Sequence, residues 1–147
     1  MAGDWNRNLI AEFHLKHGKG IGRFGDRLLL LATKGAKSGR ARLVPLAYHR
    51  DGDRYVIAAS NSGSPTNPDW YENLVKRGRA TVEVGDDHFE VRATPIADGP
   101  ERDRLYEAHA ALMPGFRAYA HKTKRVIPVV VLDRVASPQA AVGGIDR

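Results

Sequence analysis

Short apolar runs, each closed by a turn, cover most of the chain and restrict its fold to one rich in β-strands. The runs have strand length and many β-branched or aromatic side chains; they are Leu28–Thr33, Leu43–His49, Tyr55–Ser60, Ala80–Val84, Phe89–Ala93 and Ile127–Leu132. Asp51-Gly52 and the sequence "GDDH" each join two of these runs, and both are typical of hairpin turns. Strands that follow one another through hairpins predict a small antiparallel barrel rather than a parallel βαβ sheet.

Helices are expected only outside these runs. Residues 4–17 carry apolar side chains at helical spacing. Asn67-Pro68 is a typical helix start, with Asn67 as the N-cap and Pro68 at the first helical position. Further helices are expected over residues 98–112, which open with Asp-Gly-Pro, and from Pro114 toward residue 122. The predicted fold class is therefore mainly β with helical inserts (α+β).

The composition is that of a globular protein of one ordinary domain, with 147 residues, 42% of them hydrophobic and 27% charged. Cysteine is absent, which excludes disulfides, thiolate catalysis and thiolate metal sites. A net charge of +6 indicates an anionic partner without identifying it. No run reaches the roughly 20 apolar residues of a spanning helix, and the first residues lack the apolar core of a secretory signal. We therefore expect a cytoplasmic protein.

Three parts are expected along the chain: an N-terminal helix and glycine-rich linker (1–26), a barrel (27–135) and a flexible tail (136–147). The amphipathic N-terminal helix has two interpretations, because its apolar side can pack on the barrel or contact a membrane surface. His14 and His17 share one side of this helix but lack the H-E-x-x-H pattern. We therefore expect no metal site.

Residues 33–46, "TKGAKSGRARLVPL", place a group of cations beside two glycines and between apolar runs. A phosphate-binding P-loop needs Gly-Lys-Ser/Thr followed by a helix. Here Lys37-Ser38 precedes the second glycine, and a strand pattern follows. Backbone N–H groups of glycines beside Lys, Ser and Arg suit a phosphate or carboxylate. A solvated hairpin turn is equally consistent with these residues.

Two more segments carry chemically useful side chains. Residues 59–74 lead from a strand into a helix start, where free backbone N–H groups and the helix dipole favour an anion. Within this segment Trp70 and Tyr71 are typical of packing or stacking, and the serines do not form the G-x-S-x-G motif of a serine hydrolase. Residues 113, 116 and 119 (Met, Phe and Tyr) recur at helical spacing and can line a core or a pocket.

Together these segments closely resemble the deazaflavin-dependent nitroreductase family, oxidoreductases that use coenzyme F420. The similarity covers residues 30–132 and consists of "TKGAKSGRARLVPL", "DGDRYVIAASNSGSPTNPDWYENL", "ERDRLY" and "YAHKTKRVIPVVVL", in this order. It implies a split β-barrel related to FMN-binding barrels, in which the reduced deazaflavin lies along a groove. It also implies that a hydride passes from the coenzyme to an electron-poor acceptor, while the protein positions the two partners.

The resemblance implies roles for individual residues. Ser60 is expected to hydrogen-bond near the reacting edge of the ring, and Tyr119 to line the acceptor side or donate a proton. Met113, Phe116 and Tyr119 are expected to form the acceptor pocket. The implied coenzyme-binding residues are Ala36, Lys37, Ser38, Arg42, Leu43, Val44, Pro45, Leu46, Ala47, Ala58, Ala59, Ser60, Asn61, Asp69, Trp70, Tyr71, Glu72 and Asn73.

The expected acceptor pocket departs from the nitroimidazole-activating member of that family, which has tyrosines at all three positions. The change leaves an apolar pocket, which suits a quinone as well as a nitro compound. A non-catalytic deazaflavin carrier and an FMN- or haem-binding barrel are the alternatives. Nucleic-acid binding is not expected, because the cations cluster in glycine loops rather than on one helix or among stacking aromatics. Barrels of this kind are commonly dimers, so we expect a homodimer.

Overall fold

The computed structural model describes residues 2–34 and 41–135 of the chain. Its elements are α1 (Ala2–Leu15), η1 (Gly22–Phe24), β1 (Leu28–Lys34), β2 (Ala41–Ala47), β3 (His49–Asp51), β4 (Arg54–Ala58), η2 (Asn61–Gly63), α2 (Asp69–Arg77), β5 (Arg79–Val84), β6 (Asp87–Ile96), α3 (Pro100–Leu112), α4 (Gly115–Lys122) and β7 (Val129–Arg134). The predicted coenzyme residues Ala36, Lys37 and Ser38, and the predicted tail, lie outside the described residues.

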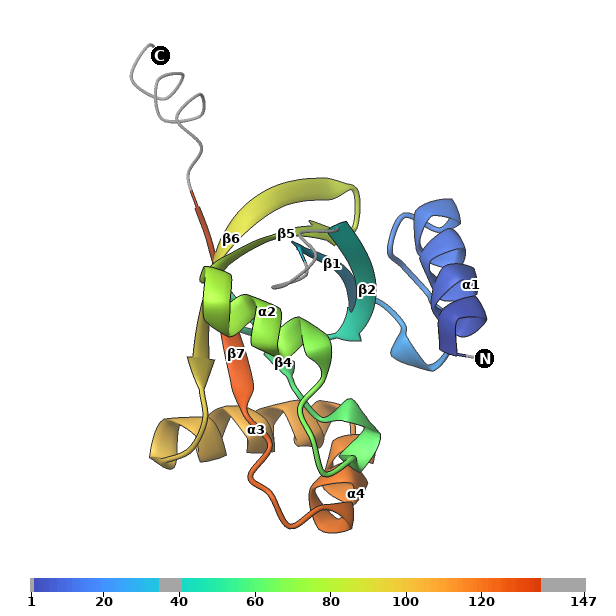
Figure 1. The fold of residues 1–147 in the computed structure, drawn as a ribbon. Coiled ribbons are helices and arrows are strands. Elements are labelled where there is room, and N and C mark those ends of the chain that lie inside the picture. The colour runs from blue at the N-terminus through green and yellow to red at the C-terminus, as the bar shows by residue number, and fades with distance from the viewer. Residues whose placement is uncertain (1, 35–40, 136–147) are drawn as a thin grey trace.

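The described strands form one seven-stranded antiparallel sheet in the order β2-β1-β5-β6-β7-β4-β3. The sheet curls, and α2 lies on its concave side (Figure 1). Because β2 and β3 are its two edges, the barrel is open between them. This architecture is the split β-barrel with helical inserts that the sequence predicts.

The strands alternate between two faces, and each face builds a different core. In β7, Val130 and Leu132 face the barrel interior, where they meet Trp70 and Leu74 of α2. The alternate residue Val131 faces a second core on the outside of the barrel. This second core includes buried residues of α3 and partly buried residues of α4, so both helices are held at one end of the barrel.

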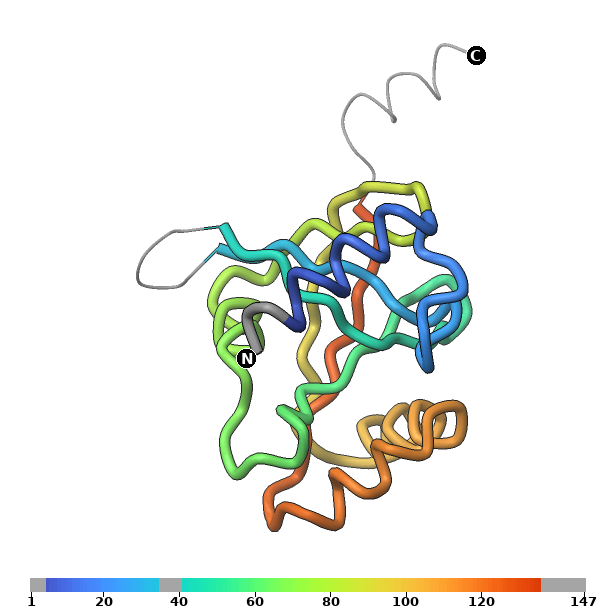
Figure 2. Tube along the Cα trace, turned by 90° about the vertical axis from the view of Figure 1, so that its right-hand side faces the viewer, coloured from blue at the N-terminus to red at the C-terminus, as the bar shows by residue number. Residues whose placement is uncertain are grey.

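The N-terminal helix packs on the outer face of β1 and β2 (Figure 2). Phe13 is 1% exposed and forms a third core with Leu28 and Leu30 of β1, against which Leu9 and Ile10 also pack. The apolar side of the helix is therefore used mainly for packing on the barrel. Membrane contact stays a prediction. No described helix is both long and apolar enough to cross a membrane.

The structure corrects two local predictions. The run predicted as one strand over residues 43–49 is broken at Tyr48, so β2 pairs with β1 whereas His49 belongs to β3 and pairs with β4. Asn67 is not the N-cap of α2; Pro68 occupies that position and the helix begins at the next residue. The side-chain oxygen of Asn67 instead accepts a hydrogen bond of 2.7 Å from Arg125, a partner far away in the sequence.

Candidate functional site

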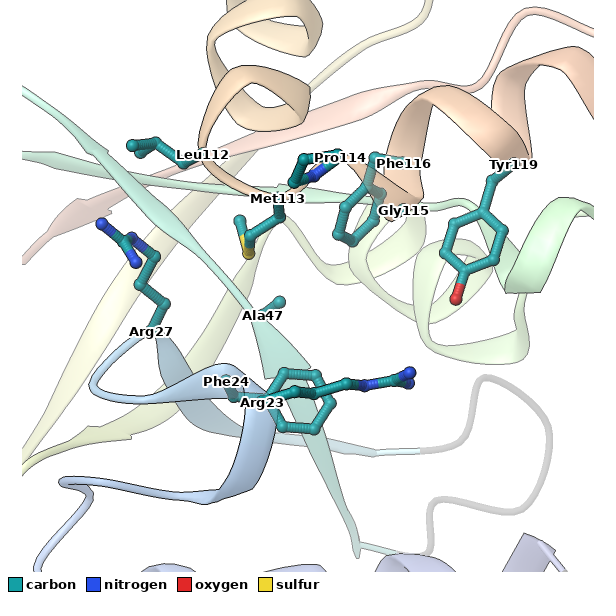
Figure 3. Close-up of a pocket in the computed structure, with 10 residues that line it drawn as sticks. All are labelled: Arg23, Phe24, Arg27, Ala47, Leu112, Met113, Pro114, Gly115, Phe116 and Tyr119. Carbon is teal, nitrogen blue, oxygen red and sulfur yellow. The ribbon is translucent and has the colours of Figure 1, made fainter.

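A pocket of about 320 Å³ opens between η1, the end of β2 and the α3–α4 connection (Figure 3). This volume lies in the range of small-molecule sites, roughly 300–1,000 Å³. Its lining residues are Arg23, Phe24, Arg27, Ala47, Leu112, Met113, Pro114, Gly115, Phe116 and Tyr119. The three residues predicted to form the acceptor pocket all belong to this lining. Ala47, from the predicted coenzyme-binding strand, lies in the same pocket.

The pocket has apolar walls and polar groups at its ends. In Figure 3 the ring of Phe24 lies across the pocket from Met113 and Phe116, and Ala47 lies between the two sides. The Tyr119 hydroxyl points into the space at one end. A flat apolar molecule fits between such walls, and its polar atoms then reach only the ends of the pocket.

The wall formed by α4 is fixed from behind. The Tyr106 hydroxyl donates a 2.6 Å hydrogen bond to the Phe116 carbonyl oxygen, which anchors the first turn of α4 to α3. The Phe116 and Tyr119 rings meet edge to face at 5.4 Å. On the far side, a Cβ placed at Gly63 would lie 2.8 and 3.0 Å from Cδ and Cβ of Lys122 and 3.2 Å from the Tyr119 carbonyl oxygen. Gly63 also has a positive φ of 79°, so the close packing of η2 on α4 favours glycine there.

Arg125 fixes the segment that joins β4 to α2. Its Nη2 donates to the carbonyl oxygens of Ala59, Ser60 and Thr66 at 3.0, 3.1 and 3.1 Å, its Nε donates to the Ser64 carbonyl oxygen at 2.9 Å and its Nη1 to the Asn67 side chain. Burial lowers the pKa of Arg125, but a guanidinium stays protonated in proteins. One cation therefore organises the segment predicted to lie beside the coenzyme ring.

Ser60 is 8% exposed and lies two residues after the end of β4, immediately before η2. It is not part of the pocket lining, although η2 packs on α4, which carries Tyr119. Ser60 thus directly precedes an element that contacts the helix of Tyr119, the other residue predicted to be catalytic. Their roles stay predictions.

The predicted coenzyme segment 42–47 is most of edge strand β2, whose residues face two ways. Val44 and Leu46 pack against the barrel interior, whereas Leu43 packs against the core under α1. A single ligand cannot touch all these side chains. Since no other described strand pairs with β2 on its outer side, its free backbone N–H and C=O groups are available to a ligand along that edge.

The predicted residues of α2 divide in the same way. The side chains of Trp70, Tyr71 and Asn73 are buried, and the two aromatic rings belong to the barrel core. Asp69 and Glu72 are exposed at the start of the helix. Arg42 Nη1 lies 3.9 Å from Asp69 Oδ2, a loose pair between two exposed side chains. Two predicted coenzyme residues from distant parts of the sequence therefore lie close together.

A second pocket, of about 400 Å³, lies at the opposite end of β2. It is lined by Ala32, Thr33, Lys34, Ala41, Arg77, Arg79, Ala80, Thr81 and Glu90. Thr33 is 6% exposed and its hydroxyl has no hydrogen-bond partner in the described part of the chain. A buried hydroxyl without a partner is uncommon, and here it lies beside several cations. Arg79 already pairs with Glu90 of the same lining at 3.5 Å, so Lys34 and the Thr33 hydroxyl are the donors that we consider for an anionic group.

A pair of buried histidines lies behind the wall of the first pocket. The Nδ1 atoms of His49 and His109 are 2.8 Å apart, and the His109 ring is 4.3 Å from the Phe116 ring. Burial, aided by the neighbouring His49, lowers the pKa of His109 to about 3. Burial also lowers the pKa of His49. Both rings are therefore neutral at physiological pH, and one Nδ1–H donates to the other Nδ1.

Sequence reasoning missed Arg23, Phe24, Arg27 and Arg125. The first three lie in a glycine-rich stretch that has no helical or strand periodicity. No sequence pattern in this stretch therefore predicts that it forms one wall of the first pocket. Arg125 lies in a quoted motif, but its five hydrogen bonds are to residues 58–66 positions away. Such contacts leave no periodic signal in one sequence.

Comparisons with known proteins agree on the family. Residues 5–134 match the profile described as F420H(2)-dependent quinone reductase. An F420H(2)-dependent quinone reductase of Mycobacterium tuberculosis (strain H37Rv) is 40% identical over 121 residues, which cover 77% of this chain and 81% of the relative. A solved F420-H2 dependent reductase, FDR-A, is 32% identical with a TM-score of 0.66 and covers 73% of this chain and 94% of its own.

A further solved chain, described as a domain-swapped dimer, is 30% identical with a TM-score of 0.68 and covers 90% of this chain and all of its own. The family match begins within α1 and ends with β7, so it includes every element that lines the first pocket. The resemblance noted in the sequence is confirmed, and the chain belongs to the F420H(2)-dependent quinone reductase family.

Proposed function

We propose that this protein oxidises reduced coenzyme F420 and passes a hydride to a quinone held in the pocket between η1 and α4. The observation that carries this proposal is the shared lining of that pocket. Ala47, at the end of the predicted coenzyme strand, lies in it together with Met113, Phe116 and Tyr119, the predicted acceptor residues. The ring of a coenzyme bound along β2 therefore ends where the acceptor binds.

The chain offers donors for an elongated coenzyme along β2. The strand has Ala47 in the first pocket and Ala41 in the second, a separation of about 20 Å at the usual rise of a strand. The ring belongs at the end near Ala47, and the anionic tail at the end near Lys34 and the Thr33 hydroxyl. Arg42 lies on the same strand and adds a cation.

When bound, the reduced coenzyme supplies a hydride, and a quinone then needs one proton to become a quinol. We assign the delivery of this proton to Tyr119; the direction of its hydroxyl, which points into the pocket, supports this role (Figure 3). Ser60 belongs on the coenzyme side, two residues beyond the end of β4. Arg125 holds the backbone of Ser60 through its carbonyl oxygen.

A quinone is favoured over a nitro compound as the acceptor. Phe24, Met113 and Phe116 present apolar surface on both sides of the pocket, and Tyr119 is the one phenol among its lining residues. A flat apolar ring with oxygens at its edges matches this distribution. The relative from M. tuberculosis is named a quinone reductase, which supports the same choice.

We also propose that the protein is a homodimer, since a 30% identical chain is described as a domain-swapped dimer. The monomer mass is 16.2 kDa, so light scattering after size exclusion should give twice that value. A mass equal to the monomer at all concentrations would refute the dimer.

The test of the function uses the purified protein with reduced coenzyme F420 and 1,4-naphthoquinone. We expect saturable binding of the coenzyme and its oxidation only when the quinone is also present. Binding without oxidation by any quinone or nitro compound would indicate a carrier. Purified protein that carries the absorbance of a flavin or a haem, and does not bind F420, would favour the other ligands of this fold.

A further inference from the structure

Two arginines frame the acceptor pocket without having an acidic partner. Arg23 and Arg27 both line it, and both are exposed. In the described part of the chain neither guanidinium has a side-chain hydrogen bond or an ion pair, and the Arg23 guanidinium carbon lies 5.3 Å from the centroid of the Phe24 ring. No aspartate or glutamate belongs to the lining. The pocket therefore has two positive charges that nothing in its walls neutralises.

The segment that carries these arginines is held in place by its own backbone. Ile21 is fully buried, and its carbonyl oxygen accepts from the N–H groups of Phe24 and Gly25 at 2.8 and 3.1 Å. The Arg27 carbonyl oxygen accepts from the Tyr48 N–H at 2.9 Å, which ties the segment to the end of β2. Both arginines thus start from a fixed backbone, so their position at the pocket follows from the fold.

The acidic side chain nearest in sequence is engaged elsewhere. Asp26 lies between the two arginines in the chain, but its Oδ1 accepts a 2.8 Å hydrogen bond from the Gly20 N–H. Its carbonyl oxygen accepts from the Tyr48 hydroxyl at 3.2 Å. Asp26 is absent from the pocket lining. The charge of the arginines is therefore available to a ligand.

The two guanidinium groups lie at different ends of the apolar walls. In Figure 3 Arg27 reaches toward Leu112, whereas Arg23 runs past Phe24 toward the side on which the Tyr119 hydroxyl lies. A molecule held between Phe24 and Met113 thus meets a cation at either end. Guanidinium groups form planar, paired hydrogen bonds to carboxylates and sulfonate-like anions, and these are stronger than bonds to neutral oxygens.

We propose that Arg23 and Arg27 select acceptors that carry an ionised acidic group on a flat, two-ring aromatic body. This inference rests on the proposed function, because it names the kind of quinone that the pocket prefers: one with a carboxylate or similar anion on the ring. The apolar walls hold the rings, and the arginines hold the anion. A neutral quinone of the same size occupies the walls but leaves both cations without a partner.

The test compares two probes that cannot be reduced by a hydride and differ only in charge, 2-naphthoate and 2-naphthamide. Their dissociation constants are measured by calorimetry at neutral pH, without coenzyme, for the full-length protein and for the variants R23Q, R27Q and R23Q/R27Q. The control is K19Q, which removes one positive charge from an exposed side chain outside the pocket lining.

We expect naphthoate to bind about tenfold more tightly than naphthamide. Each single variant should reduce this preference, the double variant should abolish it, and K19Q should keep it. Equal binding of the two probes, no binding of either, or an intact preference in R23Q/R27Q would overturn the inference. Circular dichroism of each variant shows whether it is folded, and the naphthamide affinity reports on the walls independently of the charge.

The outcome is separable from that of the proposed function. If naphthoate is preferred but no quinone oxidises the reduced coenzyme, the charge selection stands and the proposed reaction fails. If 1,4-naphthoquinone is reduced while both probes bind equally, the reaction stands and the charge selection fails. With an active protein, a higher kcat/KM for a carboxylated naphthoquinone than for the neutral one is the matching kinetic result, and R23Q/R27Q should remove that difference.

Discussion

Replacing Arg125 by glutamine should loosen the segment between β4 and α2 and destabilise the whole protein. The guanidinium donates five hydrogen bonds. Water can replace it at the Ser64 and Thr66 carbonyls, which are at least partly exposed. Water reaches the carbonyl oxygens of Ala59 and Ser60 less readily, because these two residues are only 0% and 8% exposed. The same holds for the side chain of Asn67, which is half-buried.

Three hydrogen bonds are therefore lost without replacement. At about 1 kcal/mol each, the free energy of unfolding should fall by about 3 kcal/mol. For a domain of this size, the midpoint of thermal unfolding should then fall by about 6–12 °C. Arg125→Lys should recover only a minor part of this loss, because an ammonium group cannot donate in all the directions of a planar guanidinium.

The assays are urea and thermal unfolding, followed by coenzyme binding. Arg92→Gln is the matched control, since Arg92 is exposed and has no side-chain hydrogen bond or ion pair within the described ranges. In Arg125→Gln the coenzyme should also bind more weakly, because the backbone of Ser60 is no longer held. If the variant unfolds at the same midpoint as the Arg92→Gln control, then Arg125 does not organise the segment as the hydrogen bonds indicate.

Three more predictions concern single side chains. Tyr119→Phe should lower kcat for quinone reduction by about 100-fold if the hydroxyl donates the proton, with coenzyme affinity unchanged; full activity would exclude that role. Thr33→Val should stabilise the free protein by about 1 kcal/mol, since it removes a buried hydroxyl without a hydrogen-bond partner. The same substitution should weaken coenzyme binding; unchanged binding would show that the anionic tail does not bind at Thr33. Because the folded pKa of His109 is about 3 and the unfolded value about 6.5, its contribution to stability is complete above pH 6.5 and is lost as the pH falls. The protein should therefore lose on the order of 1 kcal/mol of its free energy of unfolding between pH 7.5 and 5.5 through this residue, and His109→Phe should show a smaller loss in urea unfolding over that range.

The sequence predicts the start of a helix or a turn correctly where the residues at that position determine it themselves. Gly99-Pro100 marks the start of α3 directly, because proline fits the first turn of a helix and glycine precedes it with a positive φ. The hairpin at Asp51-Gly52 was predicted for the same reason, and Gly52 has the positive φ that this turn requires.

Local signals failed where a distant residue decides the outcome. Asn67 has the side chain of a good N-cap, but Arg125 binds its oxygen, so a long-range hydrogen bond replaced the predicted cap. The glycine-rich stretch before β1 resembled a linker. Its Phe24 forms a pocket wall only because Ile21 is buried under α1 and the turn is closed by its backbone.

The acceptor pocket has one wall that the sequence predicts and one that it does not. The spacing of Met113, Phe116 and Tyr119 predicted that they share a face, and the structure places all three in one pocket. The opposite wall comes from residues about 90 positions earlier in the chain. No pattern within a single sequence relates residues 23–27 to residues 112–119. The position of Arg23 and Arg27 at the pocket therefore follows only from the folded structure.

In the proposed reaction, reduced coenzyme F420 and a quinone meet at the end of β2. The most direct measurement is a stopped-flow experiment in which the protein, loaded with reduced coenzyme, is mixed with increasing concentrations of 1,4-naphthoquinone. We predict that the oxidised deazaflavin absorbance appears at a rate that saturates with quinone and that falls strongly in Tyr119→Phe. Tight coenzyme binding with a rate no faster than that of the free coenzyme would contradict the account.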